Sequence, residues 1–148
     1  MPYVETSIFI DSEPRKAYEL ASDMESYPKY MEDVESVTVT ERGDHTTLTD
    51  WVSNIEGTPI YWTERDNFDD ENLVITYQLT EGDLDKFEGT WKFEKNGSGT
   101  LVTLGVDFDF GIPHLEELIG PTLIIKVREN SDMMLAGLKS LCEKDKKI

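Results

Sequence analysis

Two carboxylic acids, Glu64 and Asp66, are the residues of this sequence best suited to moving protons. They lie in a strand-like run, Ile60–Phe68, whose alternation places them on the same face as Trp62 and Phe68. The apolar members identify this face as the one that points into the core. A buried carboxylate is costly unless it is hydrogen-bonded, protonated or near cavity water, and such a group suits acid–base chemistry. Asp66 and Glu64 are therefore candidate catalytic residues.

An alternative placement of these carboxylates stays open at this point. A β-bulge or the end of the strand would let one or both reach solvent, and for Glu64 we favour this alternative. Arg65 falls on the opposite face by the same alternation, where a surface arginine is the expected assignment.

Aromatic residues recur inside the strand-like runs. Trp51, Trp62 and Trp91 each lie in a different run, Phe87 shares a face with Trp91, and Tyr77 lies in the run between the last two. Aromatic side chains on a concave sheet face could stack on a flat apolar ligand, while Tyr and Trp polar atoms bind its oxygens. Plain core packing explains the same pattern equally well.

The ligand-binding candidates join these aromatic residues to others expected near a cavity. They are Tyr27, Trp51, Trp62, Arg65, Tyr77, Phe87, Trp91, Phe110, His114 and Met134. His114 opens a helical segment and could reach the cavity mouth, although solvent exposure is the commoner fate of a histidine at a helix start.

Several chemistries lack their motifs in this sequence. His45 and His114 are the only histidines, and neither belongs to a CxxC, HExxH or His-x-Glu arrangement, so no metal site is expected. GxSxG, Walker and GxGxxG motifs are absent as well, and we expect no cofactor. Cys142, the single cysteine, is expected to be a small packing residue.

Charge narrows the range of partners. The sequence has 148 residues, with 14 Lys and Arg against 31 Asp and Glu, which gives a net charge of −17. Nucleic acid and anionic membrane surfaces are therefore poor partners. We expect no signal peptide, no integral membrane segment and a cytoplasmic location, while the oligomeric state stays open.

Alternating apolar runs separated by turn residues predict most of the chain as strands. The expected order is an opening strand at 3–10, a short helix from Asp11 or Ser12 to about 23–26, and a second short helix or turn at 29–33. A meander of antiparallel strands follows, at about 36–42, 45–55, 60–69, 73–80, 85–95 and 100–110.

The chain closes with a helical pattern. Gly120 and Pro121 are expected to separate a short piece, 114–119, from a main helix of about 122–144, because proline disrupts a helix interior. One stripe of this helix faces something apolar: Leu123, Val127, Asn130, Met134, Leu138 and Leu141. The predicted class is a single α+β domain over 1–148, with a curved sheet of about seven strands around the C-terminal helix and a cavity between them.

Four local strings in this order resemble the START/Bet v1-like (SRPBCC) helix-grip superfamily, and within it the polyketide cyclase/dehydrase and aromatase/cyclase families. The strings are 23–28 (DMESYP), 62–69 (WTERDNFD), 88–91 (EGTW) and Asn130-Ser131 before Leu138. The resemblance implies a hydrophobic ligand, either a polyketide, an aromatic compound or an isoprenoid lipid, held between the sheet and the C-terminal helix.

The resemblance leaves two functions open. Aromatase/cyclases carry two arginines after Trp-Thr-Ser, and here Arg65 matches the first while Asp66 replaces the second. A carboxylate would then act as a base, or bind a polar group, where those enzymes place a cation. The alternative is a noncatalytic quinone or lipid carrier similar to the coenzyme Q-binding proteins, which share the Asp…Tyr-Pro string.

Overall fold

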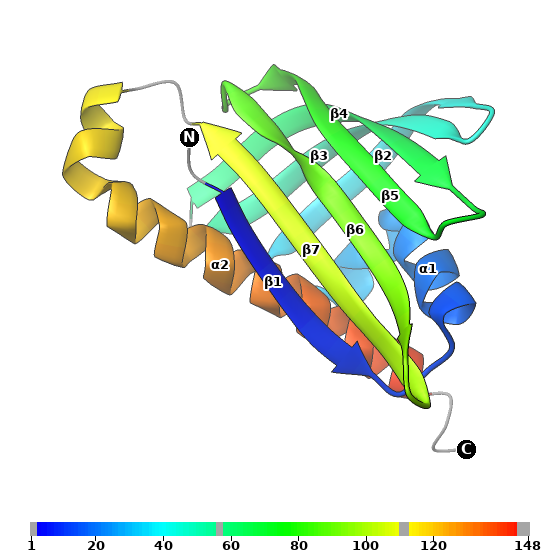
Figure 1. Cartoon of the computed structure of the whole chain (residues 1–148). Coiled ribbons are helices and arrows are strands. Elements are labelled where there is room, and N and C mark those ends of the chain that lie inside the picture. The colour runs from blue at the N-terminus through cyan, green and yellow to red at the C-terminus, as the bar shows by residue number, and fades with distance from the viewer. Residues whose placement is uncertain (1–2, 56–57, 110–112, 145–148) are drawn as a thin grey trace.

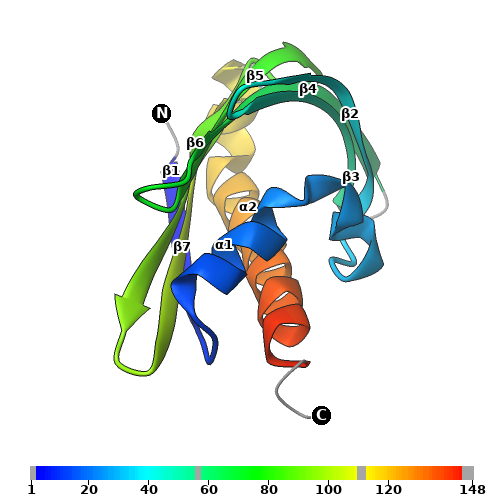
Figure 2. The ribbon, with the colours of Figure 1, turned by 90° about the vertical axis from the view of Figure 1, so that its right-hand side faces the viewer.

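The computed structural model describes residues 3–55, 58–109 and 113–144. One seven-stranded antiparallel sheet, in the spatial order β1-β7-β6-β5-β4-β3-β2, curves around a long helix (Figures 1 and 2). The strands are β1 Tyr3–Ile10, β2 Val34–Gly43, β3 Thr46–Ile55, β4 Thr58–Asp69, β5 Val74–Gly82, β6 Lys86–Asn96 and β7 Gly99–Asp109. The predicted α+β class, the seven strands and the meander are therefore confirmed.

Two short helical elements lie between β1 and β2. Helix α1, Pro14–Ser22, buries Ala17, Tyr18 and Ala21 and packs against α2, β6 and β7. Its first residue is Pro14, after Glu13, so the predicted caps at Asp11 and Ser12 are wrong. Proline fits a first turn because that position needs no N–H donor.

The second element is the 3-10 helix η1, Met24–Lys29, which lies earlier in the chain than the helix or turn expected at 29–33. It contains Tyr27, whose hydroxyl donates to the backbone carbonyl of Ala21 in α1. This bond ties the two helical elements together where they cross the open end of the curved sheet (Figure 2).

Helix α2, Pro113–Lys144, is continuous, so the predicted interruption at Gly120 and Pro121 is wrong. Pro121 is exposed, and a proline removes one helical N–H donor while the bonds before and after it can persist. In Figure 1 the yellow first turns of α2 point away from the axis of its orange part, which is the bend a proline produces.

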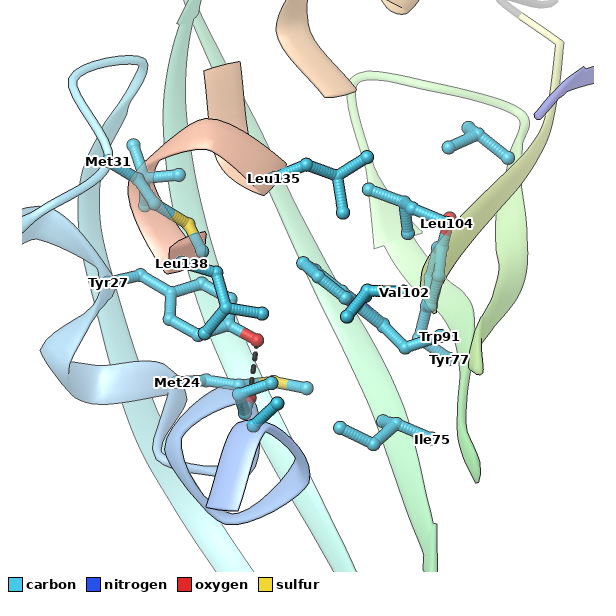
Figure 3. Close-up of a cluster of buried hydrophobic side chains, with 14 of the residues drawn as sticks. Met24, Tyr27, Met31, Ile75, Tyr77, Trp91, Val102, Leu104, Leu135 and Leu138 are labelled. Carbon is cyan, nitrogen blue, oxygen red and sulfur yellow. Dashed lines mark hydrogen bonds between the residues drawn. The ribbon is translucent and has the colours of Figure 1, made fainter. Parts of the chain in front are cut away.

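The buried stripe of α2 is shifted by about one residue from the predicted one. Val127 and Leu138 are buried as expected, whereas Asn130, Met134 and Leu141 are only half-buried. The side chain of Leu123 lies outside the described residues. Ser131, Leu135 and Cys142 complete the buried face. Figure 3 shows how this face, η1 and the sheet bring their side chains together in one core.

Candidate functional site

A cavity of about 50 Å³ lies between the concave face of the sheet and α2. Its wall on the sheet side combines aromatic and aliphatic side chains, and its helix wall carries two polar residues. The sheet contributes Val34, Trp51, Ser53, Ile60, Trp62, Glu64, Tyr77, Phe87, Trp91, Leu104 and Val106, the β5–β6 connection contributes Leu84, and α2 contributes Val127, Asn130, Ser131 and Met134.

The aromatic wall is built by cross-strand pairing. Trp51 and Trp62 are direct partners in the β3–β4 register, and their rings stack with centroids 5.4 Å apart and planes 11° apart. Phe87 of β6 lies 5.1 Å from Trp62 between centroids. Such contacts fix the orientation of large rings, which gives a flat, rigid surface suited to a flat ligand.

Both candidate carboxylates are buried on the concave side. Glu64 lines the cavity with 3% of its surface exposed, and Asp66, fully buried, lies next to it at the i+2 position of β4. A β-bulge interrupts the β4–β5 pairing between Thr63 and Glu64. The β3–β4 pairing continues without interruption through both carboxylates, so inward alternation is kept. The expectation that Glu64 reaches solvent is therefore wrong.

Each carboxyl group has its own hydrogen-bond donors. The indole N–H of Trp62 donates to Glu64 Oε1 at 2.8 Å. The hydroxyls of Thr49 and Thr47 donate to Asp66 Oδ2 at 2.7 and 3.0 Å. Asp66 Oδ1 is buried and has no partner among the described hydrogen bonds, so a proton on the neighbouring Glu64 would satisfy it. We call Glu64 and Asp66 the carboxyl pair.

The surroundings shift the pKa values of Glu64 and Asp66 to different extents. Burial raises the pKa of Glu64 well above its usual range, and the charge of Asp66 and the hydrogen bond to it raise it further. Burial also raises the pKa of Asp66, but hydrogen bonds from Glu64, Thr49 and Thr47 oppose this change. Two adjacent carboxylates cannot both ionise cheaply, so the pair retains a proton more readily on Glu64 than on Asp66.

A second polar cluster lies beside the helix wall. Asn130 donates through Nδ2 to Asp33 Oδ2, and the Asp33 carbonyl accepts hydrogen bonds from the Ser53 hydroxyl and the Asn54 amide. Burial raises the pKa of Asp33 to about 6. The sequence analysis missed Asp33 because it lies in a short turn. The available signal was Asn130, a polar residue on an apolar helix stripe that requires a buried partner.

The predicted site residues fall into four groups. The cavity brings together Trp51, Trp62, Glu64, Tyr77, Phe87, Trp91 and Met134. Asp66 lies behind Glu64, and Tyr27 lies behind the wall, with its ring 5.5 Å from Trp51 and 6.1 Å from Trp91. Arg65 is not among the lining residues, since alternation turns it to the convex face. Phe110 and the side chain of His114 lie outside the described residues.

Two kinds of feature are absent from the described ranges. No group of three or more His, Cys, Asp or Glu side chains in residues 3–55, 58–109 and 113–144 could hold a metal ion. Within the same part of the chain, no helix has the length and apolar character needed to span a membrane.

Known proteins share this architecture. The chain is 32% identical over 132 residues to the actinorhodin polyketide synthase bifunctional cyclase/dehydratase of Streptomyces coelicolor. That match covers 88% of this chain but only 40% of the relative. The crystal structure of TTHA0849 from Thermus thermophilus matches with a TM-score of 0.90 and 34% identity, covering 94% of this chain and 95% of that one.

A more distant structure shares the fold. The Zhui aromatase/cyclase from Streptomyces sp. R1128 has a TM-score of 0.88 at 19% identity, covering 97% of this chain and 94% of that one. The model of the family described as "Polyketide cyclase / dehydrase and lipid transport" matches residues 10–134. The chain therefore belongs to the polyketide cyclase/dehydrase and lipid transport family.

Proposed function

We propose that this chain binds a flat, apolar, oxygen-bearing molecule of the polyketide type and catalyses a cyclisation or dehydration on it. The observation that carries the proposal is the buried carboxyl pair, which places Glu64, with its raised pKa, on a mostly aromatic and aliphatic cavity wall. The related Streptomyces coelicolor protein is named as a cyclase/dehydratase, which supports the same reaction class.

The chemistry needs one group that both gives and takes a proton. In the dehydration of a β-hydroxy ketone, the Glu64 proton passes to the departing hydroxyl, which leaves as water with the C–O electron pair. As the C–O bond breaks, the other Glu64 oxygen removes the proton from the α-carbon, and the C–H electron pair forms the new C=C bond. Asp66 assists the proton removal, since its negative charge makes the Glu64 carboxylate a stronger base.

The cavity is too small to bind a polycyclic ligand without a change in the structure. Ligand pockets are typically about 300–1,000 Å³, far larger than the cavity of about 50 Å³ found here. A polycyclic ligand therefore has to displace lining side chains or shift α2. Met134, half-buried on α2, has the flexible thioether side chain best suited to such a movement.

A synthetic aryl β-hydroxy ketone tests the catalytic proposal, because its dehydration to the conjugated enone is followed by absorbance. Glu64→Gln keeps an oxygen for the Trp62 N–H but cannot transfer the proton, and it should lower turnover by about 100-fold or more. Glu94→Gln, an exposed change in β6, is the matched control. Equal turnover by wild type and Glu64→Gln would rule out Glu64 as the acid–base group.

A noncatalytic carrier is the second candidate function. The aromatic and aliphatic lining favours it, since a cavity of this composition holds an isoprenoid quinone or lipid without any chemistry. Native mass spectrometry of protein purified from its own host separates the two functions. A retained, chemically unchanged lipid or quinone, together with no turnover of the β-hydroxy ketone, would favour carriage.

A further inference from the structure

Asp66 lies between the ligand cavity and a second hollow on the molecule. This hollow, which we call the rim groove, has a volume of about 280 Å³ and is lined by Glu19, Ser22, Asp23, Met24, Glu25, Val39, Arg42, Thr47 and Thr49. Glu19, Asp23, Glu25 and Arg42 are exposed, so the rim groove opens to solvent. Its inner wall includes the two threonines that hold Asp66.

The order of side chains along the concave face explains this position. In the β3–β4 register Thr47 faces Asp66, Thr49 faces Glu64 and Trp51 faces Trp62. Thr47 and Thr49 line the rim groove. The ligand cavity begins at Glu64 and continues past Trp51 and Trp62. The carboxyl pair is thus the polar boundary between two separate spaces.

A chain of hydrogen bonds crosses this boundary. Thr47 borders the rim groove and donates to Asp66 Oδ2 at 3.0 Å, and the other oxygen of this carboxyl group, Oδ1, is a buried acceptor without a partner that is free for a proton on the neighbouring Glu64. A hydroxyl can accept one proton while it donates another, so Thr47 is able to relay protons. Thr49 is less suited to this task, because it is fully buried and its oxygen already accepts the Trp51 indole N–H at 2.8 Å.

We propose that Thr47 and Asp66 form a proton path from the rim groove to Glu64. When Glu64 has given its proton to a ligand, a proton from groove water binds the Thr47 oxygen, the Thr47 hydroxyl proton passes to Asp66, and Asp66 passes a proton to Glu64. Without a ligand, the Glu64 proton leaves by the reverse steps and a proton or deuteron from the groove replaces it. One proton moves and no electrons are exchanged. The path keeps the carboxyl pair in exchange with bulk water while a ligand fills the cavity and seals its other side. Its importance for catalysis rests on the proton-donor role proposed for Glu64.

Infrared spectroscopy in D₂O tests the path without any substrate. The carbonyl stretching band of a buried protonated carboxyl shifts when its proton is replaced by deuterium, and Glu64→Gln identifies the Glu64 band by removing it. Thr47→Val keeps the side-chain shape but removes the hydroxyl, and it should slow the exchange of this band by about tenfold or more. Thr47→Ser should exchange as fast as wild type.

Two further variants keep the test decisive. Thr6→Val, the same replacement at a buried threonine of β1, controls for the loss of a hydroxyl and should leave the rate unchanged. Ser22→Trp, at a half-buried residue of α1 that lines the rim groove, should exclude water from Thr47 and slow exchange even if Thr47→Val does not fold.

The outcomes separate this inference from the proposed function. Wild-type exchange rates in Thr47→Val, or in Ser22→Trp if Thr47→Val does not fold, would overturn the path and leave the catalytic proposal standing. The absence of a band removed by Glu64→Gln would also overturn it. Slowed exchange in a protein that does not convert the β-hydroxy ketone would support the path and reject the catalytic proposal.

Discussion

Replacement of Asp33 should change how the stability of this protein depends on pH. Burial raises the Asp33 pKa from an ordinary value of 3.8 to about 6 in the folded state. The folded protein therefore holds this proton more tightly than the unfolded chain. The resulting penalty on folding is absent well below pH 3.8, grows as the pH rises, and is complete above about pH 6.

The size of the penalty follows from the two pKa values. At about 1.4 kcal/mol per pH unit, the difference between 3.8 and about 6 corresponds to about 3 kcal/mol at neutral pH. Roughly half of it, about 1.4 kcal/mol, is relieved when the pH falls from about 7.5 to about 5. Asp33→Asn should lose this part of the pH dependence because its side chain does not titrate.

Urea denaturation at both pH values provides the measurement. Wild type should gain about 1.4 kcal/mol more on acidification than Asp33→Asn does. Asp44→Asn is the matched control, since it removes the same charge from a side chain that is 97% exposed and should follow wild type. Glu64 and Asp66 also have raised pKa values and contribute in the same direction, but equally in all three proteins. An identical response of wild type and Asp33→Asn would refute the reasoning.

Three other substitutions test the cavity wall and its support. Gly89→Ala would place a Cβ atom 1.9 Å from the backbone oxygen of Gly105, so β6 and β7 would have to separate; we expect a loss on the order of 3 kcal/mol or more in urea denaturation. Tyr77→Phe removes the 2.7 Å hydrogen bond to the same carbonyl and should cost about 1–3 kcal/mol by the same method. Trp91→Ala should weaken the calorimetric affinity for 2-naphthol by about tenfold or more, because it removes a large part of the flat wall.

Each of these three predictions has an outcome that contradicts it. Wild-type stability of Gly89→Ala would mean that the two strands have room for a methyl group. An unchanged free energy of unfolding for Tyr77→Phe would show that its hydroxyl contributes nothing net. Equal affinity of Trp91→Ala for 2-naphthol, in a variant that still folds, would place Trp91 outside the binding surface.

Strand alternation is enough to predict much of the site. Because side chains alternate strictly along β4, the order of residues alone puts Trp62, Glu64 and Asp66 on one face, and the β3–β4 register agrees. The expectation that a bulge lets Glu64 reach solvent was wrong, because the bulge interrupts only the β4–β5 pairing and the intact pairing with β3 keeps the side chain inward.

Other features depend on partners that are distant in the sequence. Asp33 adds nothing to the local pattern of its own turn, because its partner Asn130 lies 97 residues later; Asn130 signals a buried partner but does not say which residue it is. The continuity of α2 through Pro121 is a similar case. Pro121 does remove one helical hydrogen bond, as its low helix propensity predicts. Packing of the long apolar face of α2 against the sheet compensates for this loss.

The position of the three tryptophans has a practical consequence. The whole chain has three, and all of them line the ligand cavity. The intrinsic fluorescence of the protein at tryptophan wavelengths therefore originates entirely at the candidate binding site. The stacked indoles of Trp51 and Trp62, 5.4 Å apart, should also couple excitonically in the near-ultraviolet circular dichroism spectrum. A ligand that enters the cavity would change both signals, so unlabelled protein reports its own occupancy.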